Sequence, residues 1–121
     1  MMARPSGWPP EVPEPGAPDW ETRATAWMLD QCPPDYRGYD VFRRHPVVLA
    51  HVARACLAAA VDAAETGIRT ARHDLRGVVS HSTVDEAVAA YEHERHRLKQ
   101  AATGADLIWR ALQGERWTAK L

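Results

Sequence analysis

Apolar residues recur at intervals of three and four positions over two long stretches of the chain, residues 46–79 and 83–113. This is the period of one face of an α-helix, so the sequence predicts two long helices. In the first stretch the apolar positions are Val47, Ala50, Leu57, Val61, Ala64, Ile68, Ala71, Leu75 and Val78. In the second they are Val84, Val88, Tyr91, Leu98, Ala102, Ala105, Trp109 and Leu112. Because few residues separate the stretches, we expect a long antiparallel helical hairpin.

The residues at the ends of these stretches are typical of helix termini. Pro46 suits the first position of a helix, where the N–H that proline lacks would have no partner. Ser82 and Thr83 are each followed three positions later by an acidic residue, as in a capping box, so either could begin the second helix. Gly114 suits the position that follows the last turn of that helix.

A shorter helix is predicted ahead of the hairpin, over residues 19–31. Its apolar face consists of Trp20, Ala24, Trp27 and Met28. Asp19 is the expected N-cap. The Cys32-Pro33-Pro34 sequence ends the helix, because a residue that precedes proline is disfavoured in the helical conformation.

Residues 1–18 form a proline-rich N-terminal arm that holds six of the nine prolines. Proline fixes φ and lacks a backbone donor, so we expect an extended, polyproline-like arm. The arm could be a docking peptide for an aromatic groove of another protein, or it could be a solvated tail that lies on its own domain, which is the simpler interpretation. Residues 19–121 are assigned to a single helical domain.

Many core positions of the hairpin are alanines, which bury little area but let helices approach closely. A short first helix can cover only the open end of a hairpin that is about 45 Å long. The apolar residues toward the tip would then stay half exposed; they are Ile68, Leu75, Val84 and Val88. The predicted fold class is therefore all-α, a long antiparallel helical hairpin plus a short N-terminal helix that pairs into a dimeric helical bundle.

Composition narrows the choice of function. The chain has 121 residues and a formal net charge of −1, so no overall charge attracts nucleic acid or an anionic membrane. The longest uninterrupted apolar run, Ala55–Val61, is much shorter than a membrane span. No secretory signal pattern is evident, and we expect a cytoplasmic location without membrane association. Cys32 and Cys56 are expected to be reduced thiols, with a disulfide as the alternative.

The side chains that could perform chemistry do not form a known catalytic or metal-binding pattern. His93 and His96 lie three positions apart, whereas the zinc-protease signature needs histidines four apart. Arg95 between them is interpreted as a polar break in the helix–helix seam that fixes the register. Ser80, His81 and Ser82 lie beside a turn and lack the rigid geometry of a catalytic triad. We therefore predict no enzymatic activity, no metal and no cofactor.

Two groups of basic residues suggest an alternative function. The first is a stripe with helical spacing near the tip of the hairpin, formed by Arg69, Arg72, His73 and Arg76. The second, near the open end, is formed by Arg43, Arg44, His45, His51 and Arg54. Such stripes are usually solvated helix faces, but they leave open a nucleic-acid-associated regulatory protein, whose affinity would fall steeply with salt.

The segment between the first helix and the hairpin has the composition of a protein–protein interaction hot spot. Its candidate partner-binding residues are Tyr36, Arg37, Tyr39, Phe42, Arg43 and Arg44. Alternatively, Tyr39 and Phe42 plug the open end of the hairpin while Arg37 pairs with a nearby carboxylate. Both interpretations hold if Tyr39 and Phe42 point inward and Tyr36, Arg37 and Arg44 point outward.

Residues 32–50, CPPDYRGYDVFRRHPVVLA, resemble a segment of small uncharacterised helical proteins of high-GC Gram-positive bacteria. The resemblance implies a bacterial helical protein and brings no activity with it. Taken together, the residues favour a non-catalytic protein–protein interaction module, a small cytoplasmic adaptor or regulator that forms a homodimer and binds another protein.

Overall fold

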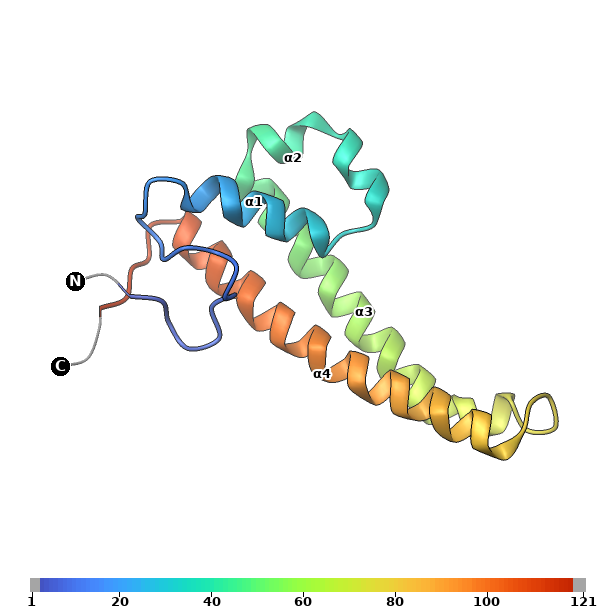
Figure 1. Cartoon of the computed structure of the whole chain (residues 1–121). Helices are drawn as coiled ribbons and strands as arrows, with labels where there is room; N and C mark the ends of the chain where they lie inside the picture. Colours follow the sequence, from blue (N-terminus) through green and yellow to red (C-terminus); the bar gives the residue numbers. More distant parts are fainter. Residues whose placement is uncertain (1–2, 119–121) are drawn as a thin grey trace.

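The computed structural model describes residues 3–118, and these form an all-helical fold without a β-strand. The elements in chain order are α1 (Trp20–Asp30), the 3-10 helix η1 (Pro34–Gly38), α2 (Asp40–Arg44), α3 (Pro46–Asp74) and α4 (His81–Leu112). Figure 1 shows α3 and α4 side by side and antiparallel, which confirms the predicted hairpin.

The tip of the hairpin differs from the prediction by several residues. The helix α3 ends at Asp74 rather than near Val79, because Gly77 adopts a φ of +77° that helices exclude. The helix α4 begins at His81, and its N-cap is Ser80, whose Oγ accepts a hydrogen bond from the Thr83 N–H at 3.2 Å. The predicted capping boxes at Ser82 and Thr83 are therefore wrong, since α4 begins before both of them.

The other helix ends follow the local signals in the sequence. Pro46 occupies the first turn of α3, as predicted. Gly114 follows α4 with a φ of +101°, and the N–H groups of Gly114 and Glu115 donate to the carbonyls of Ala111 and Arg110. This is the Schellman arrangement that satisfies the last carbonyls of a helix. Asp19 stands at the N-cap position of α1, but its side chain makes no capping hydrogen bond.

The proline-rich arm is not extended, and that prediction is wrong. Four successive turns fold it, each closed by a hydrogen bond from a backbone N–H to the carbonyl three residues earlier; the donors are Trp8, Val12, Ala17 and Trp20. Gly7 and Gly16 take the left-handed conformation that two of these turns require. Proline at the second position of a turn favours this geometry, and Pro15 occupies that position in the turn that contains Gly16.

The arm packs into the same core as the helices. Trp8 and Val12 are buried, and the Trp8 indole N–H donates to the Val12 carbonyl at 2.9 Å within the arm. The core also contains residues of α1, α3 and α4; they are Trp20, Ala24, Met28, Leu29, Leu49, Ala50, Ala53, Leu107, Ile108 and Ala111. The arm therefore lies on its own domain, as the simpler interpretation proposed, but it is a layer of the core and not a solvated tail.

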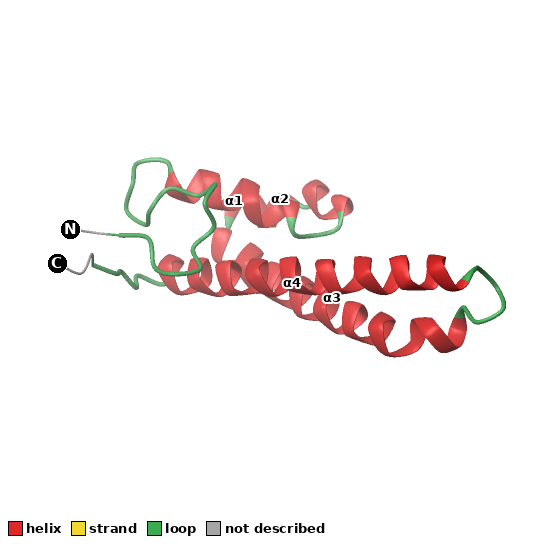
Figure 2. Cartoon of the chain, turned by 60° about the horizontal axis from the view of Figure 1, so that its bottom comes forward, coloured by secondary structure: helices red, strands yellow, loops and turns green. Residues whose placement is uncertain are grey.

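These contacts divide the molecule into two regions. The head comprises residues 3–57 and 101–118, where the arm, α1 and the segment around α2 cover one end of the hairpin. The stalk comprises residues 58–100, where α3 and α4 have only each other except at Arg97 and Gln100, which face the arm (Figure 2).

The stalk buries more of its apolar side chains than the sequence led us to expect. Val84 and Val88 are 4% and 7% exposed, because they pack with Ala71 in a small second core; the prediction that they stay half exposed is wrong. Ile68 and Leu75 are half-buried, as predicted. Three other positions of the predicted stripes are exposed instead: Val47, Val78 and Tyr91.

The helix α3 is long and apolar enough to cross a membrane, judged by length and composition alone. Its most apolar window of 18 residues has a mean hydropathy of 1.7, and 28% of that window is buried. A core helix of a soluble protein passes the same test, so this property is weak evidence for a membrane span. The absence of membrane association stays a prediction.

Candidate partner-binding site

The candidate site is the segment of residues 34–44, which we call the arch. Pro33 and Pro34 end the helical path of α1, η1 follows as a 3-10 turn, and Tyr39 is extended with φ −97° and ψ 106°. The single turn of α2 then leads through His45 to the first residue of α3. In Figure 1 the arch stands out from the head beside α1 and the start of α3.

Three aromatic rings of the arch form a cluster. The Tyr36 and Phe42 rings are stacked with their centroids 5.7 Å apart, and the Tyr39 ring meets both of them edge-on, at 6.3 and 5.9 Å. Tyr36 and Phe42 are half-buried against the head core, whereas Tyr39 is 59% exposed. The prediction that Tyr39 points inward is therefore wrong, and so is the outward orientation of Tyr36; Phe42 packs inward as predicted.

The two cysteines lie behind this cluster as free thiols. Burial, and then the neighbouring Cys56, raises the pKa of the Cys32 thiol to about 12. The same Cys56 is the largest cause of a raised pKa for the Tyr36 hydroxyl. Because Cys32 is a neutral thiol at physiological pH, it is not an activated nucleophile, and the pair belongs to the packing beneath the cluster.

Between the arch and α3 lies an aromatic cavity of about 470 Å³. The arch contributes its aromatic cluster and Val41, and α3 contributes His51, Val52, Ala55 and Cys56. The His51 ring stands 6.2 Å from the Trp109 ring of α4. This cavity is open and largely apolar, so it fits an apolar side chain or a helix with small residues.

On the other side of the arch, facing α1, lies an arginine cavity of about 620 Å³. Arg37, Arg43 and Arg44 line it, together with Pro46 and the α1 residues Glu21, Thr22, Thr25, Ala26 and Leu29. Arg37 pairs with Asp30 at 2.6 Å, which confirms the predicted carboxylate partner, and Arg44 pairs with Asp40 at 2.5 Å.

Arg43 differs from its two neighbours. Its guanidinium donates to the Arg37 carbonyl. Among the residues that the structure describes, the ion pairs at this cavity involve Arg37 and Arg44 but not Arg43. Arg43 therefore keeps its positive charge available for a carboxylate or phosphate from outside.

The basic stripe near the tip is partly neutralised. Arg72 of α3 pairs with Asp85 of α4 at 2.7 Å, and this hydrogen bond lowers the pKa of the Asp85 carboxyl. Arg69 donates to Thr66, while His73 and Arg76 are exposed. A small cavity of about 260 Å³ lies beside Arg72 and Arg76. The stripe is thus mostly a solvated helix face, and the carboxylates reduce its potential.

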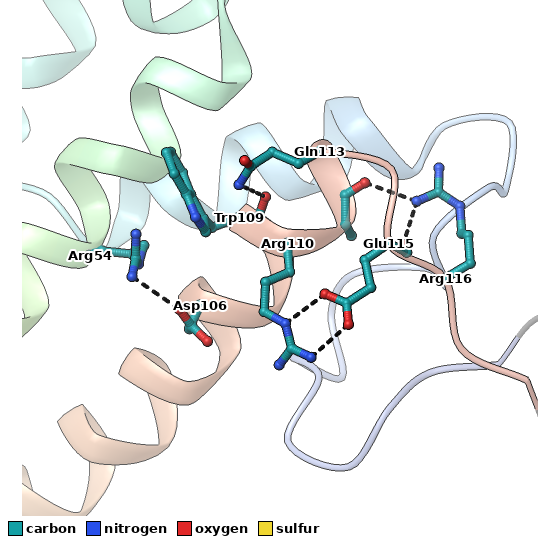
Figure 3. Close-up of polar contacts among 8 residues, drawn as sticks. Arg54, Asp106, Trp109, Arg110, Gln113, Glu115 and Arg116 are labelled. Atoms are coloured by element: carbon teal, nitrogen blue, oxygen red, sulfur yellow. Dashed lines mark hydrogen bonds and ion pairs between the residues drawn. The ribbon is translucent and has the colours of Figure 1, made fainter.

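Two arginines of the second basic group, near the open end, are also paired, namely Arg44 with Asp40 and Arg54 with Asp106. Arg54 contacts Asp106 at 3.1 Å, and its guanidinium lies 4.9 Å from the centre of the Trp109 ring (Figure 3). This arginine joins α3 to α4 and has a structural role. The sequence did not show this pairing, because the two residues are far apart along the chain.

The end of α4 carries a second set of polar contacts that fix the C-terminal tail. Arg110 donates two hydrogen bonds of 2.7 Å to the Glu115 carboxylate, and Arg116 donates to the Ala111 carbonyl (Figure 3). The two apolar residues of the tail, Trp117 and Leu121, are predicted from the sequence to fold back on the core. Trp117 does so, and its carbonyl accepts from the Ala3 N–H at 3.0 Å, whereas Leu121 lies outside the described residues.

A third cavity, of about 580 Å³, lies between the arm, α1 and α4. Its polar lining includes Gln31, Arg97 and Gln100. Gly104 allows the arm to approach α4 here, since a Cβ at this position would lie 2.8 Å from the Pro9 ring. Sequence reasoning missed this cavity, because it placed the arm outside the core.

Within residues 3–118, no group of three or more His, Cys, Asp or Glu side chains is arranged to hold a metal ion. In comparisons with known proteins, no family model, no curated protein and no solved structure matches the chain.

Proposed function

We propose that the protein is a non-catalytic protein–protein interaction module, a small cytoplasmic adaptor or regulator whose partner binds at the arch. One observation carries the proposal: an exposed, ordered segment presents an aromatic cluster on one side and three arginines on the other, each beside a cavity. Aromatic residues and arginines are the residues that most often dominate binding energy at interfaces.

The geometry of Tyr39 and Arg43 supports a binding role more than a packing role. Tyr39 is the most exposed ring of the cluster, yet two edge-on contacts hold it in place, so little side-chain entropy is lost on binding. Arg43 is held through the Arg37 carbonyl while its charge stays available. The complementary partner surface would offer an apolar side chain to Tyr39 and a carboxylate to Arg43.

The alternative, a nucleic-acid-associated regulator, has less support from the contacts. Arg72, Arg44 and Arg54 are each paired with a carboxylate, and the net charge of the chain is −1. A nucleic-acid interface needs a continuous unneutralised basic surface.

Affinity capture from the native cell, followed by mass spectrometry, tests the proposal. The Tyr39→Ala and Arg43→Ala variants should each recover at least about tenfold less of the specific partner than the wild type, as expected for hot-spot residues. Arg76→Ala, which removes an exposed arginine at the far end of the molecule, is the matched control and should retain the partner.

Equal recovery of the partner by all four proteins would place the interface elsewhere and contradict the proposal. Binding to duplex or single-stranded DNA that weakens steeply with salt and is lost in Arg76→Ala would support the nucleic-acid alternative instead.

A further inference from the structure

The helix α3 is apolar on the face that the monomer leaves open. Its most apolar window has a mean hydropathy of 1.7, but only 28% of that window is buried. A helix that is apolar on all sides is normally covered on all sides. The residues that face α1 and α4 account for the buried part; examples are Leu49, Ala53, Leu57 and Ala64.

Five apolar residues of α3 that are exposed or half-buried form one continuous line, which we call the outer strip. They are Val48, Val52, Ala55, Ala59 and Ala63; Val47 and Ala58 are also exposed, on the flank of this line. Their spacing of three and four residues places them on a single face of the helix. Val52 is half-buried and the other four are exposed. The strip spans 16 residues, or about 24 Å of helix at 1.5 Å per residue.

The two ends of the outer strip differ in shape. At the head, Val52 and Ala55 line the aromatic cavity, with the rings of the arch standing beside them. In the stalk, Ala59 and Ala63 are small and exposed, and only α4 accompanies α3 there. One end is therefore a walled recess, and the other is a slim helix with methyl side chains.

We propose that a second copy of this chain covers the outer strip in an antiparallel dimer. In this dimer the stalk portion of each α3 packs on Val52 and Ala55, on the α3 side of the aromatic cavity in the other copy's head, and leaves the exposed Tyr39 ring and Arg43 to the partner of the arch. A two-fold axis near residue 57 sets Ala55 of one copy opposite Ala59 of the second copy, and the reverse pair follows by symmetry. Alanine at both positions permits the close helix approach that this packing requires.

The polar residues beside the strip agree with the same register. His51 lies six residues before position 57 and Asp62 lies five residues after it, and both stand on the same side of the outer strip. The two-fold axis therefore brings His51 of each copy alongside Asp62 of the second copy, within about one residue of helix rise. Each Asp62 carboxylate thus has an imidazole beside it across the interface, and this hydrogen-bonding complementarity occurs twice, as a symmetric interface requires.

A second copy fits the strip better than a lipid bilayer does. The helix α4 is packed along α3 and presents charged residues to solvent over the same length, among them Glu92, Glu94 and Arg97. A bilayer core would have to accommodate those charges together with Asp62 and Glu65 of α3. The second copy instead covers the stalk, where each monomer has only two helices.

Sedimentation equilibrium of the full chain tests the dimer directly. The wild type should be a dimer at micromolar concentration, and Ala59→Arg should weaken dimerisation at least about 100-fold, because the arginine would be buried without a partner. Ala89→Arg is the matched control, since it makes the same change on the exposed face of α4, and it should remain dimeric. Circular dichroism should show the same helix content for all three proteins.

A monomeric wild type at tens of micromolar would overturn the proposal, and so would a dimer that Ala59→Arg leaves intact. If Ala59→Arg fails to fold, Ala59→Gln provides a second, milder variant with the same expected direction.

Disulfide cross-linking tests the register. In a Cys56→Ser background, separately purified Ala55→Cys and Ala59→Cys proteins should form a cross-linked heterodimer when they are mixed and mildly oxidised. A mixture of Ala59→Cys with Ala89→Cys should cross-link at least about tenfold less, because a disulfide needs Cα atoms within about 7 Å. Equal cross-linking in the two mixtures would contradict the antiparallel register.

Flotation with vesicles of phosphatidylcholine and phosphatidylglycerol separates a second copy from a membrane as the cover. The wild type should remain with the unbound fraction. Vesicle binding that Ala59→Arg abolishes would overturn the proposal in favour of a lipid surface. Loss of the dimer in Ala59→Arg with unchanged partner capture through Arg43 would leave the proposed function of the arch intact.

Discussion

The head and the stalk are built from the same two helices but reach different degrees of burial. In the head, the arm, α1 and the arch add a third layer, and side chains such as Met28, Leu49 and Ile108 lose all contact with solvent. In the stalk, the small second core of Ala71, Val84 and Val88 is what the two helices bury together near the tip. The comparison shows how much a third layer adds to a helical hairpin.

The cause is geometric. Two helices in contact can bury only the narrow row of side chains that lies between them, and alanines in that row contribute little apolar area. A third element covers the neighbouring faces as well. We therefore expect the head to provide most of the folding free energy of the monomer, and the stalk to open first.

Truncating one large side chain in each region gives the largest expected contrast. Ile108→Ala in the head should reduce the free energy of unfolding by about 3–5 kcal/mol, because it removes a fully buried side chain and leaves a cavity. Leu98→Ala in the stalk should reduce it by only about 1–2 kcal/mol, because Leu98 is half-buried and its site can relax. Urea unfolding followed by circular dichroism measures both values, and equal losses would remove the distinction between the regions.

A pair of glycines provides the next contrast. A Cβ on Gly104 in the head would lie 2.8 Å from the Pro9 ring and 3.2 Å from the Trp27 ring, both held in the core layer, so Gly104→Ala should cost about 1–3 kcal/mol. A Cβ on Gly67 in the stalk would meet only the far end of the exposed Tyr91 ring, which can rotate away. Since alanine is the better helix former by up to about 1 kcal/mol, Gly67→Ala should be close to neutral.

Thermal unfolding measures the stability of the two glycine variants, and tryptophan fluorescence reports on the arm through Trp8. In Gly104→Ala the emission should shift to longer wavelength as the arm loosens, whereas Gly67→Ala should leave the spectrum unchanged. A spectral shift in Gly67→Ala, or none in a destabilised Gly104→Ala, would show that the arm is not held through Gly104.

The sequence allowed the helical scaffold to be predicted because the signals for it are local. The periodicity of the two long helices, Pro46 at the start of one and Gly114 after the other each depend on a few neighbouring residues. The end of α3 was placed too late because Val78 continues the apolar period, although it is 71% exposed. Gly77 was the signal that the helix had already ended.

The arm shows a different limit of prediction from the sequence. Its turns were predictable in part from the Pro15-Gly16 pair, but the close approach of Pro9 to α4 depends on Gly104, nearly a hundred residues away. Contacts between distant residues leave no local pattern in a single sequence. The prolines alone suggested an extended arm, which the structure corrects.

At the candidate site, the position of the arch and the pairing of Arg37 with a carboxylate followed from composition. The orientation of Tyr39 did not, since Tyr36, Tyr39 and Phe42 are spaced three residues apart and each could have faced the core. The surrounding residues decide which rings are buried: Tyr36 packs near Cys56, and Phe42 packs against the same core. Tyr39, which contacts both of these rings, is left exposed.

The loss of stability in acid gives the smallest expected contrast between the head and the stalk, because the ion pairs that titrate are exposed. The pKa of Asp85 in the stalk is lowered chiefly by a hydrogen bond from Arg72, and the pKa of Glu115 in the head chiefly by one from Arg110. A carboxyl whose pKa is lower in the folded state adds stability that is fully present above its unfolded pKa, about 3.9 for Asp and 4.3 for Glu, and that is lost as the pH falls through the folded pKa. The contribution of these two ion pairs to stability should therefore be constant above about pH 5 and fall below about pH 4.

Asp85→Asn and Glu115→Gln separate the two regions in this titration. The Asp85–Arg72 pair joins the two helices of the stalk, whereas the Glu115–Arg110 pair holds only the tail on α4. Urea unfolding at pH 7 and pH 3 measures how much the free energy of unfolding falls in acid. This fall should be smaller in Asp85→Asn than in the wild type, and Glu115→Gln should differ from the wild type by even less. Both effects should shrink at about 1 M salt, where exposed charges are screened within about 3 Å. If Asp85→Asn is less stable than the wild type by the same amount at both pH values, the role of Asp85 depends on shape and hydrogen bonding and not on its charge. A charged pair must weaken when its carboxylate is protonated.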